Sequence, residues 1–297
     1  MVLGCIDIGS NTTRLLVADV SDGSLRVLLA ERSFTRIGRS VGATGRVPEE
    51  KIAETVQVVG AQAAAARDLG AHRVIAVATA AVRNAANRDE LVGALEARLG
   101  APLRVLSGEE EARLSFLGAT GALAETAPGA VAVIDVGGGS TEIALGTPGA
   151  GVDWWRSLPV GSGLLADLYL RSDPPAATEI EAARGHVARS FEGLAVPPAT
   201  NAVAVGGTAT SLRRMAGDAL TADTLERCVE MMGATPVAEV AERFDLDSER
   251  VRLMPAGMLL LAAVSRCLSL PMSIAIGGLR EGAIMELMHA AGDPREN

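Results

Sequence analysis

Two near-identical stretches of the sequence carry an aspartate into a turn of small residues. They are IDIGSNTT (6–13) and IDVGGGST (134–141), and a constant shift of 128 residues relates them. Glycines let backbone N–H groups approach an anion closely, and the hydroxyl and amide side chains add donors. A carboxylate repels phosphate, so its partner at such a site is a divalent cation or a water bound to one. Each stretch therefore indicates a phosphate and metal site, and the alternative, a purely structural hairpin turn, is weaker for two copies than for one.

Two further glycine pairs follow predicted strands, in Gly206-Gly207-Thr208 and in Gly277-Gly278. The first opens a predicted helix, whose N-terminal N–H groups can hold a phosphate, although a simple helix-start turn explains the pair equally well. The sequence contains no GxxxxGK[ST] pattern, which excludes a P-loop nucleotidase.

Three adjacent glutamates, Glu109, Glu110 and Glu111, are candidates for activating a water molecule. Ser107 with Glu110 fits a capping box, which would engage Glu110 with backbone N–H groups. Glu109 lies in the same first turn, where a negative charge favours the helix dipole. Glu111 has no such local role and is the preferred general base, with a solvated acidic face as the alternative.

The pattern of apolar residues predicts how these motifs are positioned. In the first half it predicts strands in VLGCIDIGSN, TRLLVADV and LRVLLAERS, a helix from Pro48 to Gly70, a strand over 72–79, a helix from Asn87 to Gly100, a strand in PLRVLS and a helix from Ser107. In the second half it predicts strands in AVAVIDVGGGST, EIALGT and VDWWRSLPVG, helices from about residue 178, and a strand that turns into a helix over 201–210.

The 128-residue shift also relates Val77 to Val205, so the two halves repeat one plan. Alternating strands and helices in both halves predict a duplicated α/β fold. We expect an N-terminal lobe over 1–124, a C-terminal lobe over 125–282, and a C-terminal helix over 283–297 that completes the first lobe.

Composition narrows the class of protein. A net charge of −9 argues against nonspecific binding to nucleic acid or to a membrane surface. The three cysteines lie far apart, which argues against a disulfide framework or a thiolate metal site. No basic or long apolar segment precedes Cys5, and the apolar run 254–271 is too short to span a bilayer. These features predict a soluble, cytoplasmic protein.

Several segments occur together in an order that resembles the exopolyphosphatase/guanosine pentaphosphatase (Ppx/GppA) family of the actin-like phosphotransfer superfamily. Besides IDIGSNTTRLL, they are VATAAVRNAANRDEL (77–91), SGEEEARLSFLG (107–118), VIDVGGGSTEIALG (133–146), AVGGTATSL (204–212), RVRLMPAGMLLL (250–261) and IAIGGLREG (274–282). The resemblance implies two actin-like (ribonuclease H-like) lobes with a central cleft, in the family's short two-domain form.

The resemblance also implies roles for individual residues. Glu111 matches the family's general base, Asp135 and Glu142 match its metal ligands, and Asp7 would support metal or phosphate from the other lobe. The alternative interpretation is that Glu142 is an ordinary exposed residue of a strand. The expected phosphate-binding residues are Gly9, Ser10, Asn11, Thr12, Arg83, Gly137, Gly138, Gly139, Ser140, Gly206, Gly207 and Thr208.

For two sets of arginines, a structural role remains an alternative to phosphate binding. Arg83 matches a phosphate-contacting arginine of the family but could instead cap surface helices. Four arginines, Arg32, Arg36, Arg39 and Arg46, lie in the predicted loop RSFTRIGRSVGATGR (32–46). They would either extend an anion-binding track or belong to a solvated surface loop.

The function that these observations predict is release of terminal orthophosphate from inorganic polyphosphate, with Mg²⁺ or Mn²⁺ as cofactor. Hydrolysis of guanosine pentaphosphate (pppGpp) is the nearest alternative, and a small-molecule kinase or a non-catalytic sensor is less favoured. The family's longer members carry an additional helical region, so we expect a preference for short chains. The family also implies a homodimer.

Overall fold

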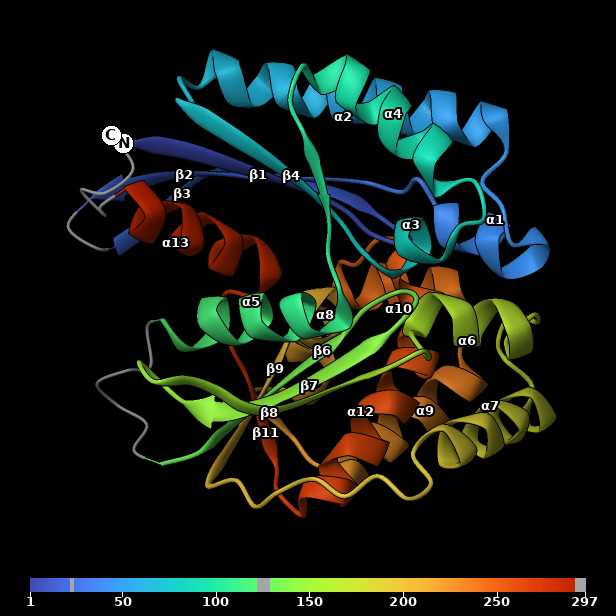
Figure 1. Ribbon diagram of the computed structural model, residues 1–297. Coiled ribbons are helices and arrows are strands. Elements are labelled where there is room, and N and C mark those ends of the chain that lie inside the picture. Colours follow the sequence, from blue (N-terminus) through green and yellow to red (C-terminus); the bar gives the residue numbers. More distant parts are fainter. Residues whose placement is uncertain (22–23, 122–128, 292–297) are drawn as a thin grey trace. The chain divides into compact units, whose positions relative to one another are not determined.

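The computed structural model describes residues 1–21, 24–121 and 129–291, and the chain divides into two compact units (Figure 1). Unit 1 comprises Met1–Gly118 and Leu279–Asn297, and unit 2 comprises Ala119–Gly278. The expected boundary at residues 124 and 125 lies outside the described residues. The expected cleft between the two lobes stays a prediction.

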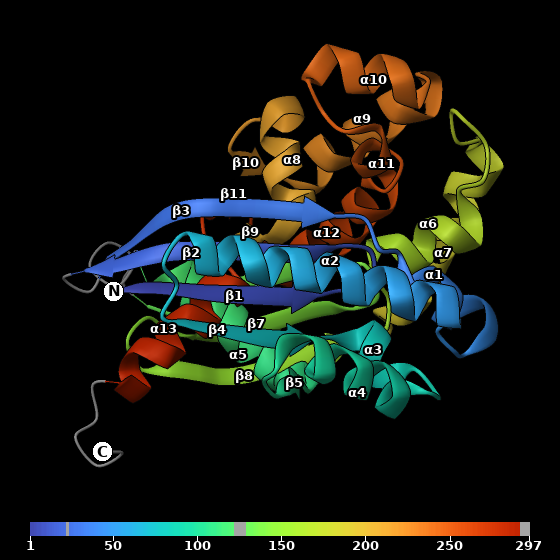
Figure 2. The same cartoon turned by 90° about the horizontal axis from the view of Figure 1, so that it is seen from above.

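The sheet of unit 1 has five strands in the order β3-β2-β1-β4-β5, which Figure 2 shows from above. Their bounds are β1 (Val2–Ile8), β2 (Thr13–Ser21), β3 (Ser24–Ser33), β4 (Arg73–Ala78) and β5 (Leu103–Val105). The first three strands form an antiparallel meander, whereas β4 runs parallel to β1, and β5 runs parallel to β4.

Helices cover both faces of this sheet (Figure 1). They are α1 (Ile37–Thr44), α2 (Glu49–Asp68), α3 (Ala80–Asn84), α4 (Arg88–Leu99), α5 (Gly108–Thr120) and α13 (Leu279–Ala291). Because successive side chains of a strand point to opposite faces, β1 contributes to two cores. Ile6 and Ile8 lie in the core that includes Ile52 and Val59 of α2. Cys5 lies in the core that includes Ile284 of α13.

The sheet of unit 2 has six strands in the order β10-β11-β9-β6-β7-β8. Their bounds are β6 (Val131–Val136), β7 (Thr141–Thr147), β8 (Gly151–Leu158), β9 (Asn201–Val205), β10 (Ala219–Leu220) and β11 (Met272–Ile274). The helices are α6 (Ser162–Tyr169), α7 (Ala177–Ser190), α8 (Gly206–Ala216), α9 (Ala222–Ala234), α10 (Val237–Phe244), α11 (Ser248–Val251) and α12 (Met254–Leu268). The apolar helix α12 is buried along most of its length.

The two sheets share one topology, which confirms the predicted duplication. The order β3-β2-β1-β4-β5 in unit 1 corresponds to β8-β7-β6-β9-β11 in unit 2. The register agrees residue for residue, because Asp7 pairs with Val77 in unit 1 and Asp135 pairs with Val205 in unit 2. The prediction of a duplicated α/β fold is therefore confirmed.

Three helices were not predicted, and one of them is the five-residue α3, which follows β4 directly. The segment 32–46, expected as a loop, contains helix α1, and a further helix, α6, precedes the helices expected from residue 178. Helices α1 and α6 are only eight residues long. Helix α1 contains two glycines and α6 contains one, so the intrinsic helix propensity of both is low. Each of these two helices begins with hydrogen bonds to the hairpin loop between the first two strands of its own sheet. These contacts with a distant loop explain the position of the helix better than any periodic pattern does. Among the described residues, no helix combines the length and the apolar character needed to cross a membrane.

Candidate functional site

The first hairpin loop, residues 9–12, is fixed by backbone hydrogen bonds at both of its ends. Within the loop, the Gly9 N–H donates to the Thr12 carbonyl at 3.0 Å. A residue outside the loop, Gly38 of α1, donates its N–H to the Ser10 carbonyl at 2.7 Å. The Asn11 carbonyl accepts from the N–H of the residue before α1, at 3.0 Å. The start of α1 therefore holds the loop in one conformation.

The second hairpin loop, residues 137–140, repeats this arrangement. The Gly137 N–H donates to the Ser140 carbonyl at 3.0 Å, as Gly9 does to Thr12. The carbonyls of Gly137 and Gly138 accept from Ser162 and Leu164 of α6, each at 2.9 Å. The unpredicted helices α1 and α6 therefore have equivalent roles, because the start of each one donates hydrogen bonds to the carbonyls of one candidate phosphate loop.

In unit 1 the topology gathers the predicted residues at one edge of the sheet. The parallel strands β1, β4 and β5 end together, because the Thr79 N–H donates to the Ile8 carbonyl at 3.2 Å and the Leu106 N–H to the Ala78 carbonyl at 2.8 Å. The loop 9–12 follows β1, α3 follows β4, and α5 follows β5. The carboxyl ends of parallel strands are the usual ligand-binding edge of an α/β sheet.

Two predicted site residues, Arg83 of α3 and Glu111 of α5, are in direct contact at this edge. Arg83 Nη1 donates both to Glu111 Oε1 and, at 2.5 Å, to the Leu106 carbonyl. The Glu111 residue is only 5% exposed. Glu111 is the buried member of an ion pair with Arg83, so it does not belong to the solvated acidic face considered as its alternative. Arg83 also contacts the Leu106 carbonyl, two residues before α5 begins, and its role in contacting phosphate stays a prediction.

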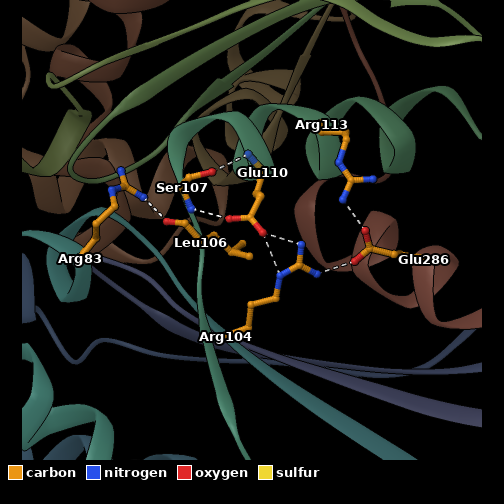
Figure 3. A network of polar contacts seen from close by, with 7 residues as sticks. All are labelled: Arg83, Arg104, Leu106, Ser107, Glu110, Arg113 and Glu286. Atoms are coloured by element: carbon orange, nitrogen blue, oxygen red, sulfur yellow. Dashed lines mark hydrogen bonds and ion pairs between the residues drawn. The ribbon is translucent and has the colours of Figure 1, made fainter. Parts of the chain in front are cut away.

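The neighbouring Glu110 has the role that its spacing from Ser107 predicts. Glu110 accepts from the Ser107 N–H at 2.8 Å, and its own N–H donates to Ser107 Oγ at 3.2 Å, which completes the capping box (Figure 3). Partial burial opposes ionisation, but the hydrogen bonds from Ser107 and Arg104 outweigh it and hold the pKa of Glu110 below its ordinary value. Glu109 is exposed. The three glutamates are thus separated by their surroundings, and Glu111 alone is buried.

In unit 2 the candidate metal ligands lie directly opposite each other. Asp135 of β6 and Glu142 of β7 are cross-strand partners, and Ser157 of β8 donates to Glu142 Oε1 at 2.7 Å. Glu142 is 4% exposed, so it is not the ordinary exposed strand residue considered as its alternative. In unit 1 the position equivalent to Glu142 is Arg14, which pairs with Asp7. The duplicated sites therefore differ in charge.

The N-terminus of helix α8 adjoins Asp135. Gly206, the first residue of α8, has φ +82°, and a Cβ there would lie 2.5 Å from Asp135 Oδ1. Gly207 lies equally close to Arg250, because a Cβ on Gly207 would lie 2.6 Å from an Arg250 guanidinium nitrogen. Arg250 is 6% exposed and Thr208 is buried. A helix N-terminus with an arginine beside it is suited to an anion.

Arg250 is the residue at this edge that the sequence analysis did not single out. It lies in the segment RVRLMPAGMLLL (250–261), which carries the resemblance to the family but no role for this arginine. No local signal marks it, because Glu249 precedes it and a second arginine, Arg252, follows two residues later. The guanidinium of Arg250 lies against Gly207, the second residue of the predicted glycine pair.

The donors present in unit 2 suit a hard divalent cation. Mg²⁺ takes oxygen ligands and is usually held by one or two carboxylates together with substrate phosphates and waters. Asp135 and Glu142 provide such a pair on adjacent strands. Within the described ranges, no group of three or more His, Cys, Asp or Glu side chains forms a complete protein cage for a metal. The two carboxylates therefore fit a cation that shares its coordination with substrate.

The four arginines of the segment 32–46 have separate surroundings. Arg32 stacks over Phe34 at 4.9 Å, and Arg46 lies 4.0 Å from Glu90. Arg36 precedes α1 with φ 53°, and Arg39 lies within that helix. A common track for an anion along these residues stays a prediction.

Comparison with known proteins identifies relatives of the whole chain. The model of the Ppx/GppA phosphatase family matches residues 16–291. The chain is 29% identical to exopolyphosphatase 1 of Mycobacterium leprae, over 99% of this chain and 91% of that protein. It is 37% identical to exopolyphosphatase 2 of Mycobacterium tuberculosis (strain H37Rv), over 78% of this chain and 80% of that protein.

Solved structures give the same result. The crystal structure of the Aquifex aeolicus member of the Ppx/GppA family matches with a TM-score of 0.80 and 28% identity, covering 99% of both chains. The crystal structure of an exopolyphosphatase-like protein matches with a TM-score of 0.86 and 25% identity, covering 96% of this chain and 97% of that one.

Proposed function

Because the chain belongs to the Ppx/GppA phosphatase family, we propose that it is an exopolyphosphatase, which hydrolyses the terminal phosphoanhydride bond of inorganic polyphosphate. Relatives named exopolyphosphatase at 29% and 37% identity support this substrate class. The observation that carries the proposal is the buried carboxylate of Glu111, which follows β5 at the same edge of the sheet as the glycine loop 9–12.

Glu111 is the proposed general base. It accepts a proton from a water molecule whose oxygen forms a bond to the terminal phosphorus. The bond from that phosphorus to its bridging oxygen breaks, and the electron pair leaves with the shortened chain. The products are orthophosphate and a polyphosphate one unit shorter. A general base of this kind contributes a factor of about 10²–10⁴ to the rate.

Arg83 positions this base. Its guanidinium holds both Glu111 and the Leu106 carbonyl, so the carboxylate is oriented before substrate binds. Preorganisation of this kind lowers the cost of reaching the reactive geometry. The proposed role of Arg83 in contacting phosphate is compatible with these bonds, because a guanidinium carries five N–H donors.

The phosphates would be held by backbone N–H groups of the loops 9–12 and 137–140 and by the N-terminus of α8. Asp135 and Glu142 would hold Mg²⁺ or Mn²⁺, with Asp7 in a supporting role. A bound divalent cation supplies charge neutralisation on the phosphoryl oxygens. A homodimer and a cytoplasmic location complete the proposal.

One observation favours guanosine pentaphosphate as a second substrate. Ile276, which precedes Gly277-Gly278, is 81% exposed and is the most exposed large apolar side chain among the described residues. Gly278 packs on Val205, the residue that leads into α8. An aliphatic side chain beside a candidate phosphate loop offers a surface to a nucleobase, which a polyphosphate chain cannot use.

The experiment is phosphate release by the purified chain with Mg²⁺ or Mn²⁺, with short polyphosphate, long polyphosphate and guanosine pentaphosphate offered in parallel. Glu111→Gln is the test variant, and Glu109→Gln, an exposed neighbour in the same turn, is the matched control. We expect Glu111→Gln to lower kcat by about 10²-fold or more and Glu109→Gln to leave it unchanged.

The arms separate the candidate functions. Faster turnover of short chains would support the expected length preference. Turnover of guanosine pentaphosphate alone would move the function to the second substrate, and Ile276→Ser would then lower it selectively. Binding of all three ligands without release of phosphate would identify a sensor instead of an enzyme.

A further inference from the structure

The first turn of α5 is held from two sides. On one side Arg83 donates to Glu111 and to the Leu106 carbonyl. On the other side Glu110, which is adjacent in sequence and about 100° away around the helix, faces Arg104 of β5. Both sets of contacts therefore hold the turn of the helix that carries Glu111.

The second side is a continuous network of ion pairs that reaches the C-terminal helix (Figure 3). Arg104 donates to Glu110 Oε1 from Nε at 3.1 Å and from Nη2 at 2.7 Å. Its remaining nitrogen, Nη1, donates to Glu286 Oε2 of α13 at 2.6 Å. Arg113, one turn along α5, donates to the other oxygen of Glu286. Two arginines and two carboxylates thus link β5, α5 and α13.

Arginine is required at the centre of this network. The guanidinium of Arg104 uses one edge for Glu110 and its far nitrogen for Glu286, so a single planar group fixes the separation of two carboxylates. Partial burial opposes the ionisation of Glu286, but the hydrogen bonds from Arg113 and Arg104 outweigh it and hold the pKa of Glu286 below its ordinary value. The network is therefore charged and intact at neutral pH.

The helices that the network connects also touch through their backbones. A Cβ on Gly282 would lie 1.9 Å from the Leu114 carbonyl of α5, so the backbones of α13 and α5 approach each other closely at this point. Glu286 lies one turn further along α13, on the same face. The apolar core contains Leu114 and Ile284, which anchors the pair of helices independently of the charges.

Stability alone does not explain the network. Its four side chains are between 31% and 48% exposed, and ion pairs at such positions contribute little to the free energy of unfolding. Their contacts instead tie the first turn of α5 to β5 and α13, within the packing that the apolar core sets. Glu111 follows Glu110 directly, so a rotation of this turn displaces the candidate base.

We propose that Arg104 and Glu286 are positioning residues that set the orientation of Glu111 through Glu110. This inference rests on the proposed role of Glu111 as general base. The residues act on the chemical step and not on substrate binding, so their loss lowers kcat and leaves KM nearly unchanged.

Unit 2 offers a matched control. Glu226 also accepts from two arginines, Arg184 and Arg266, each at 2.6 Å, and its pKa is likewise held below its ordinary value by these bonds against the opposing effect of burial. Its side chain is 19% exposed, compared with 31% for Glu286. Glu226→Gln therefore perturbs a similar pair of arginine contacts in the other unit, among α7, α9 and α12.

The test compares kcat and KM for polyphosphate in the full-length wild type, Glu286→Gln, Arg104→Ala, Arg104→Lys and Glu226→Gln, together with the melting temperature of each. We expect Glu286→Gln and Arg104→Ala to lower kcat about tenfold, because small displacements of a catalytic group are costly. Arg104→Lys keeps the charge but not the fork and should give an intermediate kcat. Glu226→Gln should match the wild type in kcat.

Failure of this inference differs from failure of the proposed function. If Glu111→Gln abolishes turnover while Glu286→Gln retains the wild-type kcat, the network is not a positioning device and the enzyme class stands. An equal fall of kcat in Glu226→Gln, or a rise of KM alone in Glu286→Gln, would also overturn it. A wild type that releases no phosphate, or a Glu111→Gln variant with full activity, overturns both.

Discussion

Asp135 and Glu142 lie directly opposite each other on β6 and β7, whereas the same positions of unit 1 hold Asp7 and Arg14. Directly opposed residues on antiparallel strands have Cβ atoms about 5 Å apart, and like charges there destabilise each other. Unit 1 balances its aspartate with an arginine, but unit 2 places two carboxylates together. The second arrangement offers two carboxylates, which is the donor set that suits a divalent cation.

The first prediction is that Mg²⁺ alone stabilises the protein through this pair. Adding Mg²⁺ should raise the melting temperature of the wild type, because a ligand of the native state stabilises it by mass action. Glu142→Gln should weaken Mg²⁺ binding by about tenfold or more. Asp153→Asn, an exposed carboxylate of the same sheet, is the control. Asp7→Asn should have the smaller effect, and an undiminished Mg²⁺ response in Glu142→Gln would place the metal elsewhere.

A second prediction concerns the contact between Gly206 and Asp135. Gly206→Ala adds a Cβ 2.5 Å from Asp135 Oδ1 and should lower both activity and stability. The control is Gly217→Ala at the other end of α8, where φ is +76° but no atom lies within 4 Å of the added Cβ. The strain of a positive φ, about 1–3 kcal/mol, is common to both variants. Urea unfolding should therefore show similar losses from strain, while phosphate release should fall only in Gly206→Ala.

A third prediction is a pH-dependent contribution to stability from Glu179 of α7. Hydrogen bonds from the Ser172 hydroxyl, and from backbone N–H groups that include Ala176, lower the pKa of Glu179 from 4.5 to about 2. A carboxylate with a depressed folded-state pKa stabilises the fold above its unfolded value and loses that effect as pH falls. Glu179→Gln should therefore lower the melting temperature at pH 7, and the difference should shrink between about pH 5 and pH 2. A difference that is constant across this range would contradict the prediction.

The three cysteines give a fourth prediction. Burial raises the pKa of the Cys5 thiol strongly, and the negative charge of Asp7 raises it further. Cys267 is exposed, and burial raises its pKa to a smaller extent. Iodoacetamide at pH 8 should therefore alkylate Cys267 first and leave Cys5 unmodified until the protein unfolds, as peptide mass spectrometry can establish. Early modification of Cys5 would indicate that the core around α13 opens in the native state.

The sequence was most informative where a local rule decides the structure. Alternating apolar residues and turn residues predicted the strands around Asp7 and Asp135, and the spacing of Ser107 and Glu110 predicted the capping box that forms. Asn87 does begin a helix, as predicted, but its side-chain oxygen accepts from the Val47 N–H and not from its own helix.

The features that escaped prediction depend on contacts between distant residues. Helix α6 is positioned by the carbonyls of Gly137 and Gly138, about 25 residues before it, so no local period marks it. The pairing of Arg83 with Glu111 joins two helices across a strand. Arg250 approaches Gly207 from more than 40 residues away. These contacts join residues that are far apart in the sequence, so no local sequence pattern predicts them.

The discontinuity of unit 1 has a consequence for biosynthesis. Its second core includes Leu279, Ala283 and Ile284 of α13, which leave the ribosome after all of unit 2. Unit 2 is continuous in sequence and can complete its core earlier. The face of β1 that packs on α13 is therefore covered only after unit 2 has been translated, and the ion pairs of Glu286 with Arg104 and Arg113 form only after unit 2 has emerged.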